Sequence, residues 1–66
     1  MEIINFNKKI YPYQTVEQAI ADWQNLAVFT ISTKPKYWQV EIKPIDQQFK
    51  NKIKDEFANY VLGLLA

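Results

Sequence analysis

The chain has 66 residues, no cysteine and no histidine, and its eight lysines and seven acidic residues leave a net charge of +1. These absences exclude disulfides, the usual zinc ligands and the Ser-His or Cys-His pairs of nucleophilic enzymes, so we expect no catalytic residue, metal or cofactor. A balanced charge without arginine also disfavours nucleic acid as a partner, because binding to phosphates needs a basic surface.

Hydrophobic residues make up 48% of the chain, which is enough to predict a single folded domain over residues 1–66. No stretch approaches the roughly 18 apolar residues of a membrane span, and the first ten residues are too polar for a secretion signal. We therefore expect a cytoplasmic protein with no membrane partner. A chain of this size is only marginally stable alone, and association is one way to stabilise it.

The first predicted elements are a strand over residues 2–10 and a helix that begins near Thr15. Apolar and polar residues alternate along the strand, with Ile4, Phe6 and Ile10 on one face. Thr15 and Gln18 have the spacing of a capping box at a helix start. The helix that follows carries one apolar stripe, which consists of Val16, Ala19, Ile20 and Trp23.

Two further strands are predicted over residues 27–33 and 37–43, because apolar side chains again alternate with polar ones. Between them, residues 33–36 place a proline at the first central position of a tight turn, which favours an antiparallel hairpin. Pro44 ends the third strand, and Asp46 is the predicted N-cap of a long final helix. The apolar stripe of that helix consists of Phe49, Ile53, Phe57, Tyr60, Val61 and Leu64.

The predicted order is therefore β-α-β-β-α, which indicates a two-layer α+β fold with a three-stranded sheet and both helices packed on one face. This is the ferredoxin-like order lacking the last strand. In that topology the last strand would lie beside the first one, so the first strand is predicted to be an open edge.

The final helix has a second apolar face. At about 100° per residue, Ala58, Leu62 and Leu65 lie roughly opposite the core stripe, so one sheet cannot cover both sets. Either these leucines are ordinary exposed residues, or they form an interface. Together with the open edge, they predict a partner-binding surface for self-association or for a partner protein or peptide. Its predicted residues are Ile3, Asn5, Asn7, Leu62 and Leu65.

Two other groups of side chains are candidates for a catalytic or a nucleic-acid-binding site. Asp55 and Glu56 are adjacent acids, but neighbours on a helix point about 100° apart, so we interpret them as solvated surface rather than a catalytic dyad. The aromatic residues of the chain could stack on single-stranded nucleic acid, yet the signature of an RNA-recognition motif is absent. Core packing explains these rings better, and a small nucleic-acid-binding domain is kept as the alternative function.

One set of residues, spread over nearly the whole sequence, matches the pattern of a known family; it consists of Tyr11, Pro12, Val16, Ala19, Ile20, Val40, Ile42, Glu56, Phe57, Asn59 and Leu62. In these residues the chain resembles the small HxsD proteins of His-Xaa-Ser peptide-maturation systems. The resemblance implies a bacterial accessory protein that works beside radical-SAM maturation enzymes and a precursor with His-Xaa-Ser repeats. A chain without cysteine cannot itself hold an iron-sulfur cluster, so binding is the role that we expect.

Overall fold

The structure is a computed structural model that describes residues 2–45 and 52–66. It contains three strands and two helices in the predicted order, which confirms the α+β fold class. The elements are β1 (Glu2–Asn7), α1 (Tyr13–Asp22), β2 (Ala27–Thr33), β3 (Tyr37–Pro44) and α2 (Ile53–Leu65).

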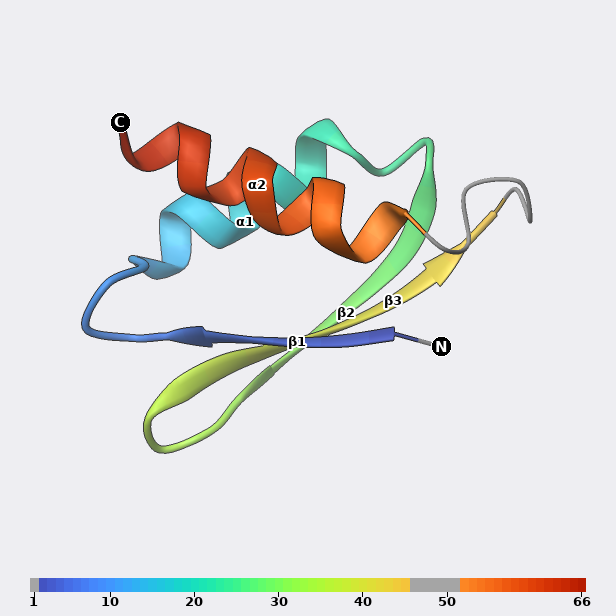
Figure 1. The fold of residues 1–66 in the computed structure, drawn as a ribbon. Coiled ribbons are helices and arrows are strands. Elements are labelled where there is room, and N and C mark those ends of the chain that lie inside the picture. Colours follow the sequence, from blue (N-terminus) through green and yellow to red (C-terminus); the bar gives the residue numbers. More distant parts are fainter. Residues whose placement is uncertain (1, 46–51) are drawn as a thin grey trace.

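The three strands form one antiparallel sheet in the order β1-β3-β2, and both helices lie on the same face of it (Figure 1). The central strand β3 pairs with both neighbours, so that Ile4 and Ile31 lie opposite Val40 on either side. The predicted hairpin is confirmed, and its turn is closed by the Lys34 N–H, which donates to the Tyr37 carbonyl at 3.0 Å. Within the described residues, β1 is an edge strand, as the sequence predicts.

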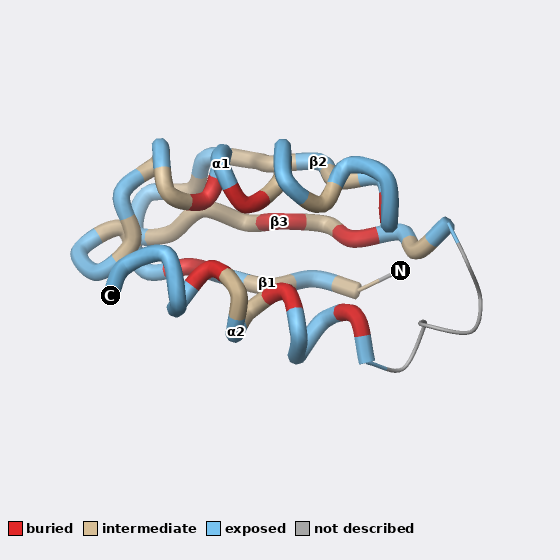
Figure 2. The backbone as a smooth tube through the Cα atoms, turned by 90° about the horizontal axis from the view of Figure 1, so that it is seen from above, coloured by how far each residue is buried: buried red, intermediate tan, exposed pale blue. Residues whose placement is uncertain are grey.

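The core lies between the sheet and the two helices, and both layers contain buried residues (Figure 2). Phe57 of α2 is fully buried, and its ring lies against the rings of Phe29, Trp23 and Phe6, with centroids 4.7, 5.4 and 6.2 Å away. The buried residues are Phe6, Val16, Ala19, Ala27, Val40, Ile42, Ile53, Phe57 and Val61. Because they come from every element, the predicted apolar stripes meet in one cluster.

The boundaries of the first two elements differ from the prediction. Strand β1 ends at Asn7 because the Asn7 carbonyl accepts from the Ile10 and Tyr11 N–H groups and its side chain accepts from the Lys9 N–H. This local turn leaves Ile10 58% exposed.

Helix α1 begins at Tyr13 rather than near Thr15, and Pro12 is its N-cap. Proline suits this position because its ring fixes φ, here at −64°, and because the first helical turn needs no N–H from it. The Thr15 N–H donates to the Pro12 carbonyl, so Thr15 is already inside the helix. The predicted capping box is therefore wrong, and Gln18 instead donates to the Asp22 carboxylate at 2.8 Å.

Helix α2 begins at Ile53, after Lys52 as its N-cap. The predicted N-cap Asp46 and the stripe residue Phe49 lie outside the described residues. Ile53, Phe57 and Val61 are buried, as the stripe predicts, but Leu64 is 39% exposed and its assignment to the core is wrong. Leu64 belongs to the last turn of α2, beyond Val61, the last buried residue of the helix.

Candidate protein-binding edge of the sheet

The outer edge of β1 carries backbone groups that no described strand pairs with. Antiparallel strands alternate between residues that exchange hydrogen bonds with the neighbour and residues whose N–H and C=O point away from it. The Lys8 N–H donates to the Lys36 carbonyl at 3.1 Å, which continues the pairing of Asn7 with Tyr37 by one residue. By this alternation, Ile4 and Phe6 bond to β3.

The backbone groups of Ile3, Asn5 and Asn7 therefore face outward. The turn after β1 agrees with this assignment, because the Asn7 carbonyl accepts from Ile10 and Tyr11 rather than from β3. The outward groups of Ile3 and Asn5, with the N–H of Asn7, define what we call the open edge.

Helix α2 lies above the sheet and runs along this edge. Figure 1 shows α2 on the helical face of the sheet, running in the same direction as β1. In Figure 2, which looks down on the helices, α2 lies on the side of β1 that is away from β3, whereas α1 lies over the opposite part of the sheet. The position that a fourth strand would occupy beside β1 is therefore beneath α2.

One flank of α2 faces α1. The Tyr60 hydroxyl donates to the Asp22 carboxylate at 2.5 Å, and its ring lies 5.6 Å from that of Trp23. Asp22 raises the pKa of Tyr60, mainly because its carboxylate accepts the phenolic hydrogen bond. This contact joins the two helices side by side, in agreement with the rotation of α2 that buries Ile53, Phe57 and Val61.

The opposite flank of α2 faces outward over the open edge. At about 100° per residue, Ala58 and Leu65 lie on the other side of the buried stripe from Tyr60, and Leu62 lies further round toward solvent. Ala58 is half-buried, whereas Leu62 and Leu65 are 54% and 37% exposed. We call Ala58, Leu62 and Leu65 the outer flank of α2.

The five residues predicted to bind a partner lie on two elements, three on β1 and two on α2. The backbone groups of Ile3, Asn5 and Asn7 lie at the open edge, along which α2 runs, and Leu65 lies on the flank of α2 on that side, whereas Leu62 faces solvent. The side chains of the three strand residues lie on the other face of the sheet, where the Asn5 amide accepts from Gln39 at 3.5 Å. The structure therefore places the strand backbone, but not the strand side chains, on the side of the sheet edge that α2 overlies.

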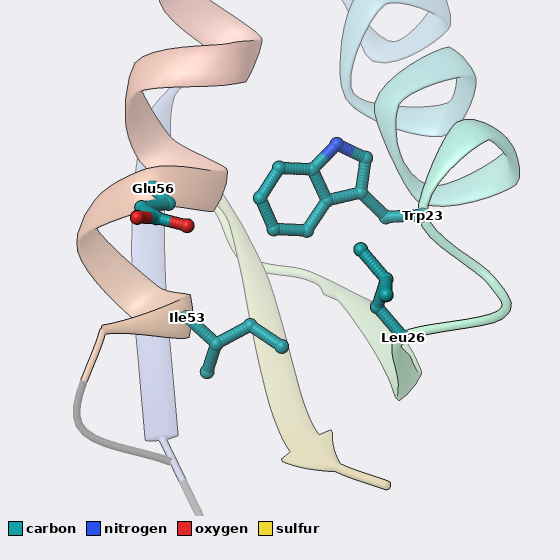
Figure 3. A pocket seen from close by; sticks show the side chains of 4 residues that line it. All are labelled: Trp23, Leu26, Ile53 and Glu56. Atoms are coloured by element: carbon teal, nitrogen blue, oxygen red, sulfur yellow. The ribbon is translucent and has the colours of Figure 1, made fainter. Parts of the chain in front are cut away.

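A second feature, which the sequence did not predict, is an apolar pocket of about 320 Å³ between the start of α2 and the end of α1 (Figure 3). Trp23, Leu26 and Ile53 form its apolar wall, and the exposed Glu56 carboxylate lies at its rim. The sequence feature that could have indicated this pocket is Leu26, an apolar residue that belongs neither to the helical stripe before it nor to the alternating strand pattern after it. The pocket lies on the α1 side of α2, away from the open edge.

The aromatic side chains do not form one stacking surface. The Trp38 indole N–H donates to the Tyr11 carbonyl at 2.8 Å, its ring packs edge-on against Tyr13, and the Lys8 ammonium lies 4.5 Å above it. Tyr37, its neighbour on β3, faces the other side of the sheet because successive strand residues alternate. The rings of Trp38 and Tyr37 therefore lie on opposite faces of the sheet.

Within residues 2–45 and 52–66, no group of three or more acidic side chains could hold a metal ion. None of the helices described is long and apolar enough to cross a membrane. Comparison of the chain with protein-family models, with curated proteins and with solved structures finds no match. The candidate site is therefore argued from its own geometry.

Proposed function

We propose that this protein is a non-catalytic binding module that adds an extended segment of a partner protein or peptide to the open edge of β1. The observation that carries the proposal is the coincidence of two surfaces. The outward backbone groups of Ile3 and Asn5 offer hydrogen bonds, and α2, whose outer flank carries Ala58 and Leu65, runs along the same edge (Figure 2). Main-chain pairing supplies affinity in this mode of recognition, and contacts to alternate side chains supply specificity.

The setting that we propose is the cytoplasm of a bacterium, beside radical-SAM enzymes that mature a precursor with His-Xaa-Ser repeats. The resemblance to HxsD proteins supports this setting. A binding role is compatible with the chemistry of the chain, because it has no cysteine or histidine with which to hold a cluster or a zinc ion.

The rival function, binding of nucleic acid, has less support. The net charge is only +1, and the rings that lie together, those around Phe57, pack in the core rather than along an exposed basic surface. Affinity for nucleic acid falls steeply with salt because counterions are released on binding, whereas strand addition against an apolar helix is less sensitive to salt.

The test is a titration of the isotope-labelled chain with a synthetic peptide in which apolar and polar residues alternate, followed by the amide signals of each residue. We expect the signals of Ile3 and Asn5 to shift, and the shifts to persist between about 50 and 200 mM salt, the range over which phosphate contacts weaken strongly. Single-stranded DNA is the matched control ligand. Saturable binding of the DNA with no response to the peptide would overturn the proposal in favour of the rival function.

A further inference from the structure

We infer that the occupant of the open edge is a lone extended segment that runs antiparallel to β1, rather than the β1 strand of a second copy. The inference rests on the proposed function and names the partner of the same site. Three features carry it: the position of α2, the alternation of the backbone groups along β1, and the turn that follows Asn7.

The position of α2 argues against a second copy. Adjacent strands lie about 4.8 Å apart, whereas packed helices need about 8–10 Å between their axes. If two copies joined edge to edge in the antiparallel arrangement, both α2 helices would lie on the same face, and each would lie over the other copy's β1, because α2 lies outside β1 (Figure 2). The two helices would then compete for the same space. A segment without a helix of its own meets no such obstacle.

The backbone groups set the length and pattern of the segment. Both pairings within the sheet are antiparallel, and we extend this arrangement to the added strand. A segment of about five residues spans the positions opposite Asn7, Phe6, Asn5, Ile4 and Ile3. Its second and fourth side chains lie on the helical face with Phe6 and Ile4, below the outer flank of α2. Those two residues should be apolar, and the other three should be polar.

The turn after β1 makes the first position of the bound segment, opposite Asn7, different from the other four positions. The residue opposite Asn7 would normally donate its N–H to the Asn7 carbonyl, but that carbonyl already accepts from Ile10 and Tyr11, at 3.1 and 2.9 Å. A carbonyl oxygen has two lone pairs, so no further acceptor site remains there. Because the first residue of the segment needs no N–H, the site should accept proline at this position and not at the third.

The probe is a capped peptide of sequence Lys-Thr-Val-Thr-Val-Thr-Lys, whose valines fall opposite Phe6 and Ile4. One variant carries an N-methyl group on the threonine opposite Asn5, whose N–H faces β1. The matched control carries it on the valine opposite Ile4, whose N–H faces away. We expect the first change to weaken binding about tenfold or more and the second to change it little. Proline in place of the first threonine should also bind.

Sedimentation of the chain alone shows whether a wrong result concerns only the inferred partner or the proposed function as well. We expect a monomer, and peptide-dependent shifts confined to β1 and the outer flank of α2. A concentration-dependent dimer that protects the Ile3 and Asn5 amides from exchange would overturn the inference while leaving binding at the open edge in place. Equal effects of the two N-methyl variants would overturn the alternating backbone pairing of the segment with β1. If neither peptide nor dimer perturbs β1, the proposed function fails as well.

Discussion

At the scale of single residues, Phe57 contributes most to the core. It is fully buried, and three aromatic rings from β1, β2 and the end of α1 surround it. Truncation of a buried phenylalanine to alanine costs about 3–5 kcal/mol, a large share of the stability of a small domain. We therefore expect Phe57→Ala to lower the free energy of unfolding by about this amount, measured by urea denaturation.

Leu62→Ala is the control for this prediction, since Leu62 lies on the same helix and is 54% exposed. We expect it to change the free energy of unfolding by no more than about 0.5 kcal/mol. A Phe57→Ala variant that unfolds at the same urea concentration as the parent would contradict the central position of this ring.

The contact between Tyr60 and Asp22 predicts a dependence on alkaline pH. Because the folded state raises the pKa of Tyr60 above its ordinary value of 10.0, the hydrogen bond contributes fully below pH 10 and is lost as the pH rises through the folded pKa. In a titration followed by tyrosinate absorbance, subtracting the Tyr60→Phe curve from the parent curve leaves the ionisation of Tyr60, whose midpoint should lie above pH 10. Asp22→Asn should bring the Tyr60 midpoint back toward 10, and an unchanged midpoint would show that another group causes the shift.

At the scale of elements, the alternation along β1 predicts opposite results for proline at adjacent positions. Proline removes a backbone N–H and is tolerated in an edge strand only where that N–H faces away from the sheet. Asn5→Pro should therefore leave the chain folded but abolish binding at the open edge. Ile4→Pro should destabilise the sheet, because its N–H faces β3. Thermal unfolding followed by circular dichroism compares the two, and equal destabilisation would contradict the assignment of the outward groups.

Gly63 of α2 gives a second prediction at this scale. An added Cβ at this position meets no heavy atom within 4 Å, and the backbone φ is not positive. Alanine should therefore stabilise the helix by removing the entropy cost of glycine, by about 0.5 kcal/mol near a helix end. A modest rise in the melting temperature is the expected result. A fall would indicate that the last turn of α2 needs the flexibility of glycine.

The sequence predicts the elements better than it predicts their ends. Periodicity identifies the three strands and both helices, because burial of one face requires apolar residues at that spacing. The ends depend on backbone hydrogen bonds that periodicity does not report. Pro12 caps α1 without a side-chain oxygen, and the Asn7 carbonyl ends β1 through bonds to Ile10 and Tyr11.

The candidate site was predictable only in part. The open edge follows from the order of the elements, and the second apolar face of α2 follows from its helical spacing. Their position on one side of the molecule depends on how α2 is placed over the sheet, which follows from tertiary contacts such as that of Tyr60 with Asp22. Tyr60 and Asp22 are 38 positions apart, and neither local pattern predicts their contact.

At the scale of the whole molecule, the fold is a two-layer domain whose outer helix extends over a position that no described strand occupies. Strand β1 and helix α2 run in the same direction, so the end of α2 lies near the Asn7 end of β1 (Figure 1). A strand appended after Ala66 through a short turn would therefore run antiparallel to β1, beneath the outer flank of α2. This geometry allows the proposed partner to be supplied within the same chain.

We expect such an appended segment, a flexible turn followed by alternating threonine and valine, to occupy the open edge. Burial of two valines and five new hydrogen bonds should offset the cost of ordering the segment. The fusion should unfold at a higher urea concentration, protect the Ile3 and Asn5 amides from exchange, and no longer bind the free peptide. A glycine-serine extension of equal length is the control. If both extensions leave stability, amide exchange and peptide binding unchanged, then the edge does not accept a strand, because a tethered segment has a far higher effective concentration there than any free partner.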